Sequence, residues 1–110
     1  ESSAAGAAGP DELIRMRHYT SVSRAPQIMS DQILHGRDQG RVFMEDARRK
    51  VLSPREAESL YQLGRGRGRA VIEFDVQRSA VYEGKNSRTG EPEWVSRARS
   101  IVIYNLERIR

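Results

Sequence analysis

The stretch AVIEFDV at residues 70–76 gives the strongest strand signal in the chain. From residue 72 onward, apolar β-branched or aromatic side chains alternate with the carboxylates of Glu73 and Asp75. Successive side chains on a strand point to opposite faces, so one face is apolar and the other carries both carboxylates. We expect a strand here with a buried apolar face and solvated carboxylates.

More strands are expected on the C-terminal side of this stretch. The apolar runs there are short and are separated by residues typical of turns. A short strand begins at Val81-Tyr82, a turn-rich loop covers 84–92, and the last section opens with Glu93-Trp94-Val95 and ends in a strand over 100–106. The second half of the chain is therefore predicted to be mostly strand.

The sequence SPRE at residues 53–56 is the clearest helix start. Ser53 suits the N-cap, Pro54 the first helical position, and Glu56 completes a capping box. We expect this helix to end near Gly64, with a buried face formed by Ala57, Leu60, Tyr61 and Leu63.

A second helix is expected over residues 25–34, because apolar residues recur there near helical spacing and His35-Gly36 suits a helix end. A short strand over 40–44 then leads into the acidic pair Glu45-Asp46. Helices in the first half and strands in the second predict an α+β fold around a mostly antiparallel sheet.

The length of 110 residues fits one domain. Residues 1–12 begin with ESSAAGAAGP and are expected to be a flexible linker, which leaves 13–110 as the folded domain. The first residue is Glu1 rather than methionine, so we expect the chain to be a piece of a longer protein.

Composition excludes several kinds of site. The chain has no cysteine, which excludes disulfides, thiolate metal sites and cysteine nucleophiles, and its two histidines argue against a transition-metal site. No apolar run approaches the ~18–20 residues of a membrane-spanning helix. The net charge is +4, and only Lys50 and Lys85 of the basic residues are lysines. Arginine suits an anionic partner such as nucleic acid, although arginine-rich codon usage explains the same composition.

The sequence RHYTS at residues 17–21 is the first candidate site. If it is extended, His18 and Thr20 share one face and Tyr19 takes the other. His18 suits a hydrogen bond to a ribose or the role of general base, and a structural histidine is the alternative.

Two further candidates lie in the second half. Glu93 stands at a strand entrance beside Trp94, where a carboxylate can be held in a cleft; pairing with an arginine is the alternative. The glycine-rich run RGRGR at 65–69 lacks the lysine and spacing of a P-loop. Its side chains Arg65, Arg67 and Arg69 suit phosphate contacts, and a mobile connection is the alternative.

With these landmarks, the chain resembles small ADP-ribosyltransferase toxin domains of the His-Tyr-Asp/Glu kind, which are found at the C-termini of bacterial polymorphic toxins of the Rhs and contact-dependent types. The resemblance covers about residues 15–104 and depends on the order of its motifs. These are His18-Tyr19-Thr20, the segment 28–34, Val42-Phe43-Met44-Glu45-Asp46, residues 68–76, and Gly90-Glu91-Pro92-Glu93-Trp94-Val95. At Met44 the family usually has Thr or Ser, which leaves the role of Asp46 open.

This resemblance implies a split sheet that holds NAD in its cleft. It implies that Glu93 is the catalytic carboxylate, that His18 hydrogen-bonds a ribose, and that Glu91 takes part in target choice. It further implies that Tyr19 shapes the pocket, that Thr20 supports the strand, and that Phe43 or Tyr61 packs on nicotinamide.

The function implied is transfer of ADP-ribose from NAD to a protein or a structured RNA in the cytoplasm of a rival cell, after secretion as part of a larger toxin. A cognate immunity protein, acidic and covering the His18–Glu93 cleft, is expected as a partner. Two alternatives remain open at this point: a metal-independent toxin ribonuclease that uses His18 with Glu73 or Glu93, and a non-catalytic nucleic-acid-binding module.

Overall fold

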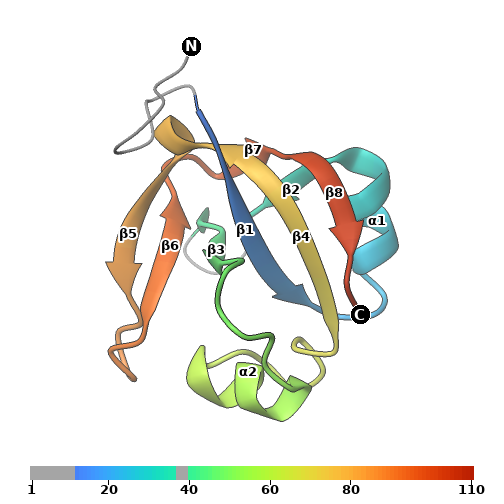
Figure 1. Ribbon diagram of the computed structural model, residues 1–110. Coiled ribbons are helices and arrows are strands. Elements are labelled where there is room, and N and C mark those ends of the chain that lie inside the picture. The colour runs from blue at the N-terminus through green and yellow to red at the C-terminus, as the bar shows by residue number, and fades with distance from the viewer. Residues whose placement is uncertain (1–11, 37–39) are drawn as a thin grey trace.

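The computed structural model describes residues 12–36 and 40–110 (Figure 1). Apart from Glu12, the predicted linker over 1–12 lies outside the described residues. The elements are β1 (Leu13–Thr20), α1 (Ala25–Asp31), β2 (Ile33–His35), β3 (Phe43–Asp46), α2 (Pro54–Leu60), β4 (Ala70–Gln77), the 3₁₀-helix η2 (Arg78–Ala80), β5 (Val81–Lys85), β6 (Pro92–Ser96), β7 (Ser100–Val102) and β8 (Tyr104–Arg108). The α+β prediction is confirmed.

Strands β1 and β4 are neighbours in a six-stranded sheet with the order β5-β6-β3-β1-β4-β8. The two strands are antiparallel and pair along their whole length, from Leu13 opposite Gln77 to Thr20 opposite Ala70. Phe74 is fully buried against the core on one face, so the predicted strand over 70–76 is confirmed.

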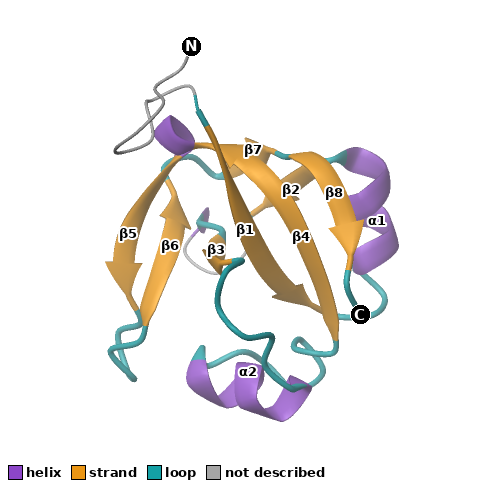
Figure 2. Cartoon of the chain, in the orientation of Figure 1, coloured by secondary structure: helices purple, strands orange, loops and turns teal. Residues whose placement is uncertain are grey.

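The short strand β3 splits this sheet. Its first half pairs with β6, with Phe43 opposite Val95, whereas its second half pairs with β1, with Arg17 opposite Glu45. Because one short strand joins two neighbours at different points, β5 and β6 diverge from β1, β4 and β8 (Figure 2). This is the split sheet that the resemblance implied. The strand predicted over 40–44 begins later than expected and includes Glu45 and Asp46.

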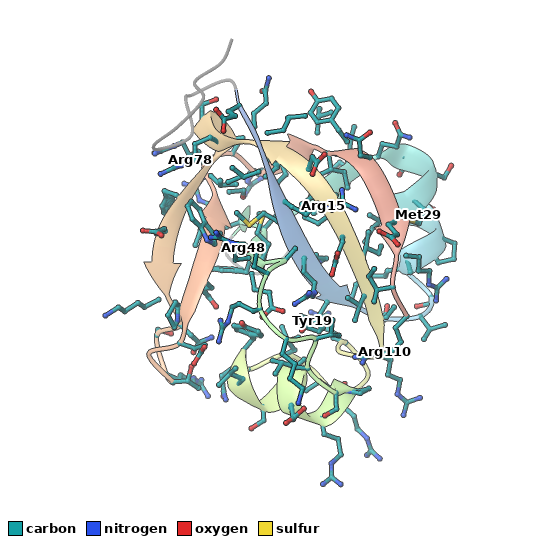
Figure 3. All side chains as sticks on the ribbon, in the orientation of Figure 1. Arg15, Tyr19, Met29, Arg48, Arg78 and Arg110 are labelled. Carbon is teal, nitrogen blue, oxygen red and sulfur yellow. The ribbon has the colours of Figure 1, made fainter. Side chains whose placement is uncertain are left out.

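Helix α2 covers the end of β1 and β4. Its capping box is present as predicted: Ser53 Oγ accepts from the Glu56 N–H at 3.2 Å, and Glu56 Oε1 accepts from the Ser53 N–H at 2.9 Å. Tyr19, Val71 and Ala57 form a small core between the helix and these two strands, where Figure 3 shows Tyr19.

The helix is shorter than predicted. It ends at Leu60 rather than near Gly64, and Gln62 has a left-handed backbone (φ 57°) that cannot continue an α-helix. Of its expected buried face only Ala57 is fully buried. The other three expected members, Leu60, Tyr61 and Leu63, are half-buried.

Two other boundaries differ from prediction. The helix expected over 25–34 ends at Asp31, because Gln32 is left-handed (φ 57°). Ile33 and Leu34 then form β2, which pairs with β7 in a separate two-stranded sheet. His35 is thus a strand residue rather than a helix end.

The strand expected over 100–106 is divided into two strands that pair with different partners. Its first part, β7, pairs with β2, whereas its second part, β8, pairs with β4. Ile103 lies between them, is 1% exposed, and donates its N–H to the Gln32 carbonyl at 3.1 Å. Tertiary partners therefore decide where this apolar run divides.

Candidate active site

A groove of about 530 Å³ opens where the sheet splits. Its size lies in the range of small-molecule and cofactor sites. Residues from β1, α1, β3, β6 and the segment after α2 line it. It brings together seven of the predicted site residues, namely His18, Tyr19, Thr20, Phe43, Tyr61, Arg67 and Glu93.

His18 is fixed to the neighbouring strand by its ring. Its Nδ1 lies 2.9 Å from the backbone oxygen of Phe43. A carbonyl only accepts hydrogen bonds, so Nδ1 carries the proton. Desolvation lowers the pKa of His18, and the charge of Arg24 lowers it further. The ring is therefore neutral at pH 7, and its Nε2 is an acceptor for a hydroxyl.

Glu93 is the buried carboxylate of the groove wall. It lies on β6 and is 6% exposed. Burial raises its pKa above the usual value, and a hydrogen bond with the Asn86 side chain offsets part of this rise. In the part of the chain that the structure describes, Glu93 forms no ion pair. The alternative, a loop carboxylate paired with an arginine, is therefore wrong.

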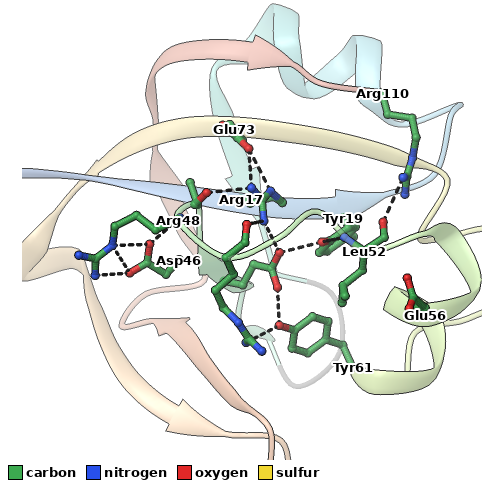
Figure 4. A network of polar contacts seen from close by, with 12 residues as sticks. Arg17, Tyr19, Asp46, Arg48, Leu52, Glu56, Tyr61, Glu73 and Arg110 are labelled. Atoms are coloured by element: carbon green, nitrogen blue, oxygen red, sulfur yellow. Dashed lines mark hydrogen bonds and ion pairs between the residues drawn. The ribbon is translucent and has the colours of Figure 1, made fainter.

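A second buried carboxylate, Glu45, is the residue that sequence reasoning missed as a site member. Figure 4 labels three of its hydrogen-bond partners, Arg17, Tyr19 and Tyr61. Glu45 is 2% exposed and accepts three side-chain hydrogen bonds. Its Oε2 accepts from Arg17 and from the Tyr19 hydroxyl, both at 2.7 Å, and its Oε1 accepts from the Tyr61 hydroxyl at 2.5 Å. The sequence signal is its place directly after the strand predicted over 40–44, which indicated only an acidic strand end.

The carboxylates of β4 are paired rather than solvated, which corrects the expectation for Glu73 and Asp75. Glu73 accepts from the buried Arg17 guanidinium at 2.8 Å, and Asp75 accepts from Arg15 at 3.2 Å. The register of β1 on β4 places each arginine directly opposite its carboxylate. The strand pattern showed that the carboxylates share a face but not that arginines face them.

The two tyrosines join this network to the groove. The Tyr19 hydroxyl also accepts the N–H of Leu52 at 3.0 Å, and its ring centroid lies 6.1 Å from that of Tyr61. Burial, together with Glu45, raises the pKa of Tyr19 to about 12 and also raises that of Tyr61. Both hydroxyls therefore stay protonated as donors to Glu45, which fixes the Tyr61 ring at the groove.

Three predicted residues stand apart from the groove lining: Glu91, Arg65 and Arg69. Glu91 forms an ion pair with Arg49, which also donates to the Tyr61 hydroxyl at 3.0 Å. The roles expected for these residues, target choice for Glu91 and phosphate contacts for Arg65 and Arg69, stay predictions.

Metal sites and membrane-spanning helices are both absent from the described residues. Among the described residues no cluster of His, Cys, Asp or Glu is arranged to hold a metal ion. No helix among them is long and apolar enough to span a membrane.

Comparison with known proteins gives one result for the whole arrangement. The family model described as HYD1 signature containing ADP-ribosyltransferase matches residues 16–99. Searches of curated proteins and of solved structures find no match. The matched range includes His18, strand β3 and Glu93, and it contains every residue that lines the groove. The chain therefore belongs to the HYD1-signature family of ADP-ribosyltransferase toxin domains.

Proposed function

We propose that this domain transfers ADP-ribose from NAD to a macromolecule, with Glu93 as the catalytic carboxylate. The observation that carries the proposal is the state of Glu93: it is buried, has no ion pair in the described chain, and lines the same groove as His18 and two aromatic rings. Leaving a buried carboxylate unpaired costs stability, which is typical of a functional site.

The residues of the groove fit NAD. The neutral His18 offers Nε2 to a ribose hydroxyl, and Phe43 and Tyr61 offer rings against which nicotinamide can pack. Arg24, at the start of α1, and Arg41, which precedes β3, also line the groove, where their charges suit a diphosphate. Tyr19 and Thr20 hold the wall of the groove in place, since both are buried on β1.

NAD, when bound, supplies ADP-ribose together with nicotinamide as a leaving group. Loss of nicotinamide develops positive charge on the ribose, as in glycoside hydrolysis. The Glu93 carboxylate stabilises this charge and accepts from a neighbouring ribose hydroxyl, which favours the transition state over the bound substrate. A fixed charge of this kind contributes about 3–4 kcal/mol.

Glu45 has a different role in this proposal. Both of its oxygens already accept hydrogen bonds from Arg17, Tyr19 and Tyr61. It therefore acts as a positioning residue, which holds the Tyr61 ring against the ligand. The ribonuclease alternative loses one of its two carboxylates, because Glu73 is occupied by Arg17 and so is a poor partner for His18. The version that uses His18 with Glu93 is distinguished by the test with NAD.

The biological setting belongs to the same proposal. We expect the domain to be secreted as part of a larger toxin and to act in the cytoplasm of a rival bacterium. We also expect an acidic immunity protein to cover the His18–Glu93 groove, because the domain is basic, with a net charge of +4. Expression of the domain alone should arrest growth of a bacterium, and co-expression of the adjacent reading frame should restore it.

The direct test uses NAD labelled in its adenylate phosphate, incubated with purified domain and bacterial lysate. The expected result is release of nicotinamide and transfer of label to macromolecules. RNA shortening without NAD would support the ribonuclease instead. A salt-sensitive shift of nucleic acid, with neither reaction, would identify a binding module.

A further inference from the structure

We propose that the acceptor is a nucleic-acid strand, whose phosphates are bound by Arg67 and Lys85 at the Glu93 end of the groove. The proposal deepens the proposed function, because the strand is the acceptor of that same reaction. RNA and DNA share this phosphate chemistry, and the binding experiment distinguishes between them.

Arg67 and Lys85 reach the groove from two different segments. Arg67 belongs to the segment between α2 and β4, and Lys85 ends β5. On the β5–β6 ladder Gly84 lies opposite Glu93, so Lys85 follows directly after the strand partner of the proposed catalytic residue, and both Lys85 and Glu93 line the groove. Polar side chains of Gln62, Asn86 and Ser87 line the same end.

Neither cation is neutralised within the described chain. The side chains of Arg67 and Lys85 form no ion pair and no hydrogen bond there. Two carboxylates nearby are already engaged: Glu91 pairs with Arg49, and Glu58 accepts the N–H groups of Gly66 and Gly68, both at 3.0 Å. Glu93 lines the same groove but forms no ion pair with either cation in the described chain. Two uncompensated positive charges beside a concave surface attract an anionic ligand.

The positive charge continues past the groove along the same segments. Arg65 and Arg69 flank Arg67, and Arg88 follows Lys85 in the next loop; all three are exposed. Several exposed cations on two neighbouring segments suit the repeated phosphates of a strand better than the isolated carboxylates of a protein. Within the segment around Arg67, Gly66 has a left-handed backbone (φ 86°) and no neighbouring atoms on the side where a Cβ would lie, so the backbone is open to close approach there.

The transfer step balances with such an acceptor. An oxygen or ring nitrogen of the strand forms a bond to C1′ of the ribose, while the bond from C1′ to the nicotinamide nitrogen breaks and its electron pair returns to the nicotinamide ring. A proton on the attacking atom passes to water. In the proposal, Arg67 and Lys85 hold the phosphates on either side of the attacking nucleotide.

Binding can be measured without any reaction. A fluorescein-labelled single-stranded RNA, and DNA of the same sequence, are titrated with three proteins: the wild-type domain, the double variant R67A/K85A, and a matched control K50A/R108A. Lys50 and Arg108 are exposed and are not among the residues that line the groove. Melting temperatures show that all three proteins are folded.

The expected result is about tenfold weaker binding by R67A/K85A, with the control binding like the wild type. The slope of log affinity against log salt should fall by about 1.4 in the double variant, because each phosphate contact on a single strand contributes about 0.7. Equal affinity of the double variant and the control would overturn the proposal. Preference between the RNA and DNA probes identifies the source of the strand.

A labelling arm separates this proposal from the proposed function. Wild-type domain is incubated with adenylate-labelled NAD and either the RNA, the DNA or lysate protein. Label in nucleic acid supports the proposal. Label in protein alone, with nicotinamide released, overturns it and leaves the proposed function standing. No release of nicotinamide with any acceptor would refute the proposed function, and the acceptor role with it.

Discussion

Among the described residues two carboxylates are buried, Glu45 and Glu93, and their polar partners differ greatly in number. Glu45 is 2% exposed and accepts hydrogen bonds from Arg17, Tyr19 and Tyr61, whereas Glu93 is 6% exposed and has only the Asn86 side chain. Burial of a charge is costly unless it is paired. The difference indicates a structural role for Glu45, whereas the unpaired state of Glu93 is what the proposed function explains by a ligand.

The largest effect is expected from E93Q, which keeps the shape of the side chain and removes its charge. Transfer should fall by roughly 100- to 1000-fold, as for loss of a fixed electrostatic contact in other enzymes. The melting temperature should not fall, because the variant also removes a desolvated charge. Initial rates and thermal unfolding measure the two effects. Wild-type rates in E93Q would show that Glu93 is the wrong carboxylate.

The matched substitution E45Q should mainly lower the stability of the fold, in contrast to E93Q, which mainly lowers the rate of transfer. It removes the negative charge that faces the buried Arg17 and places an amide N–H₂ where a carboxylate oxygen accepted hydrogen bonds. Breaking one partner of a buried pair costs about 3–5 kcal/mol, and Glu73 still faces Arg17, so we expect the lower value. Urea denaturation measures the change. A variant as stable as wild type would contradict the structural role of Glu45.

Y19F tests the hydrogen-bond network of Glu45 by removing one of its donors. Loss of the hydroxyl leaves the Leu52 N–H without its acceptor and Glu45 with one donor fewer. An unsatisfied buried group costs about 1–3 kcal/mol. Denaturant unfolding should show this loss of stability, while NAD affinity of the folded protein changes little. A change in affinity without a change in stability would place the hydroxyl at the ligand.

H18A is expected to have a smaller effect, which should appear in the affinity for NAD rather than in stability. One hydrogen bond to a ribose is worth about 1 kcal/mol, so NAD affinity should fall about fivefold. Calorimetry measures the affinity, and thermal unfolding provides the comparison. If stability fell sharply while affinity stayed the same, the bond from His18 to the Phe43 carbonyl would be the function of this residue, and the structural alternative would hold.

The smallest effect expected is a pH dependence that belongs to Glu93. Its folded pKa is raised, so the folded state favours the protonated form. The resulting stability is fully present below the unfolded pKa and is lost as pH rises through the folded pKa. Activity has the opposite dependence, because the ionised carboxylate is needed, and should fall as pH drops through the raised pKa. E93Q should show neither dependence; if its stability profile matched the wild type, another group would be responsible.

Local sequence patterns determined much of this fold. The alternation in residues 70–76 predicted β4, and the capping box Ser53–Glu56 predicted where α2 begins, because each depends on residues close together in the chain. The ends of helices and strands were harder to place. Left-handed backbone at Gln32 and Gln62 ends both helices, and the sequence carries no glycine there to indicate it.

For the site, too, the sequence indicated some of the residues, and only the structure revealed the others. Candidate residues such as His18 and Glu93 were found by their residue types and by the resemblance, and the structure places both at one groove. Glu45 was missed because its importance comes from Arg17, Tyr19 and Tyr61, which are distant from it in sequence. Only the tertiary structure decided which carboxylates are paired, since that depends on the register of β1 between β3 and β4 and on the split of the sheet at β3.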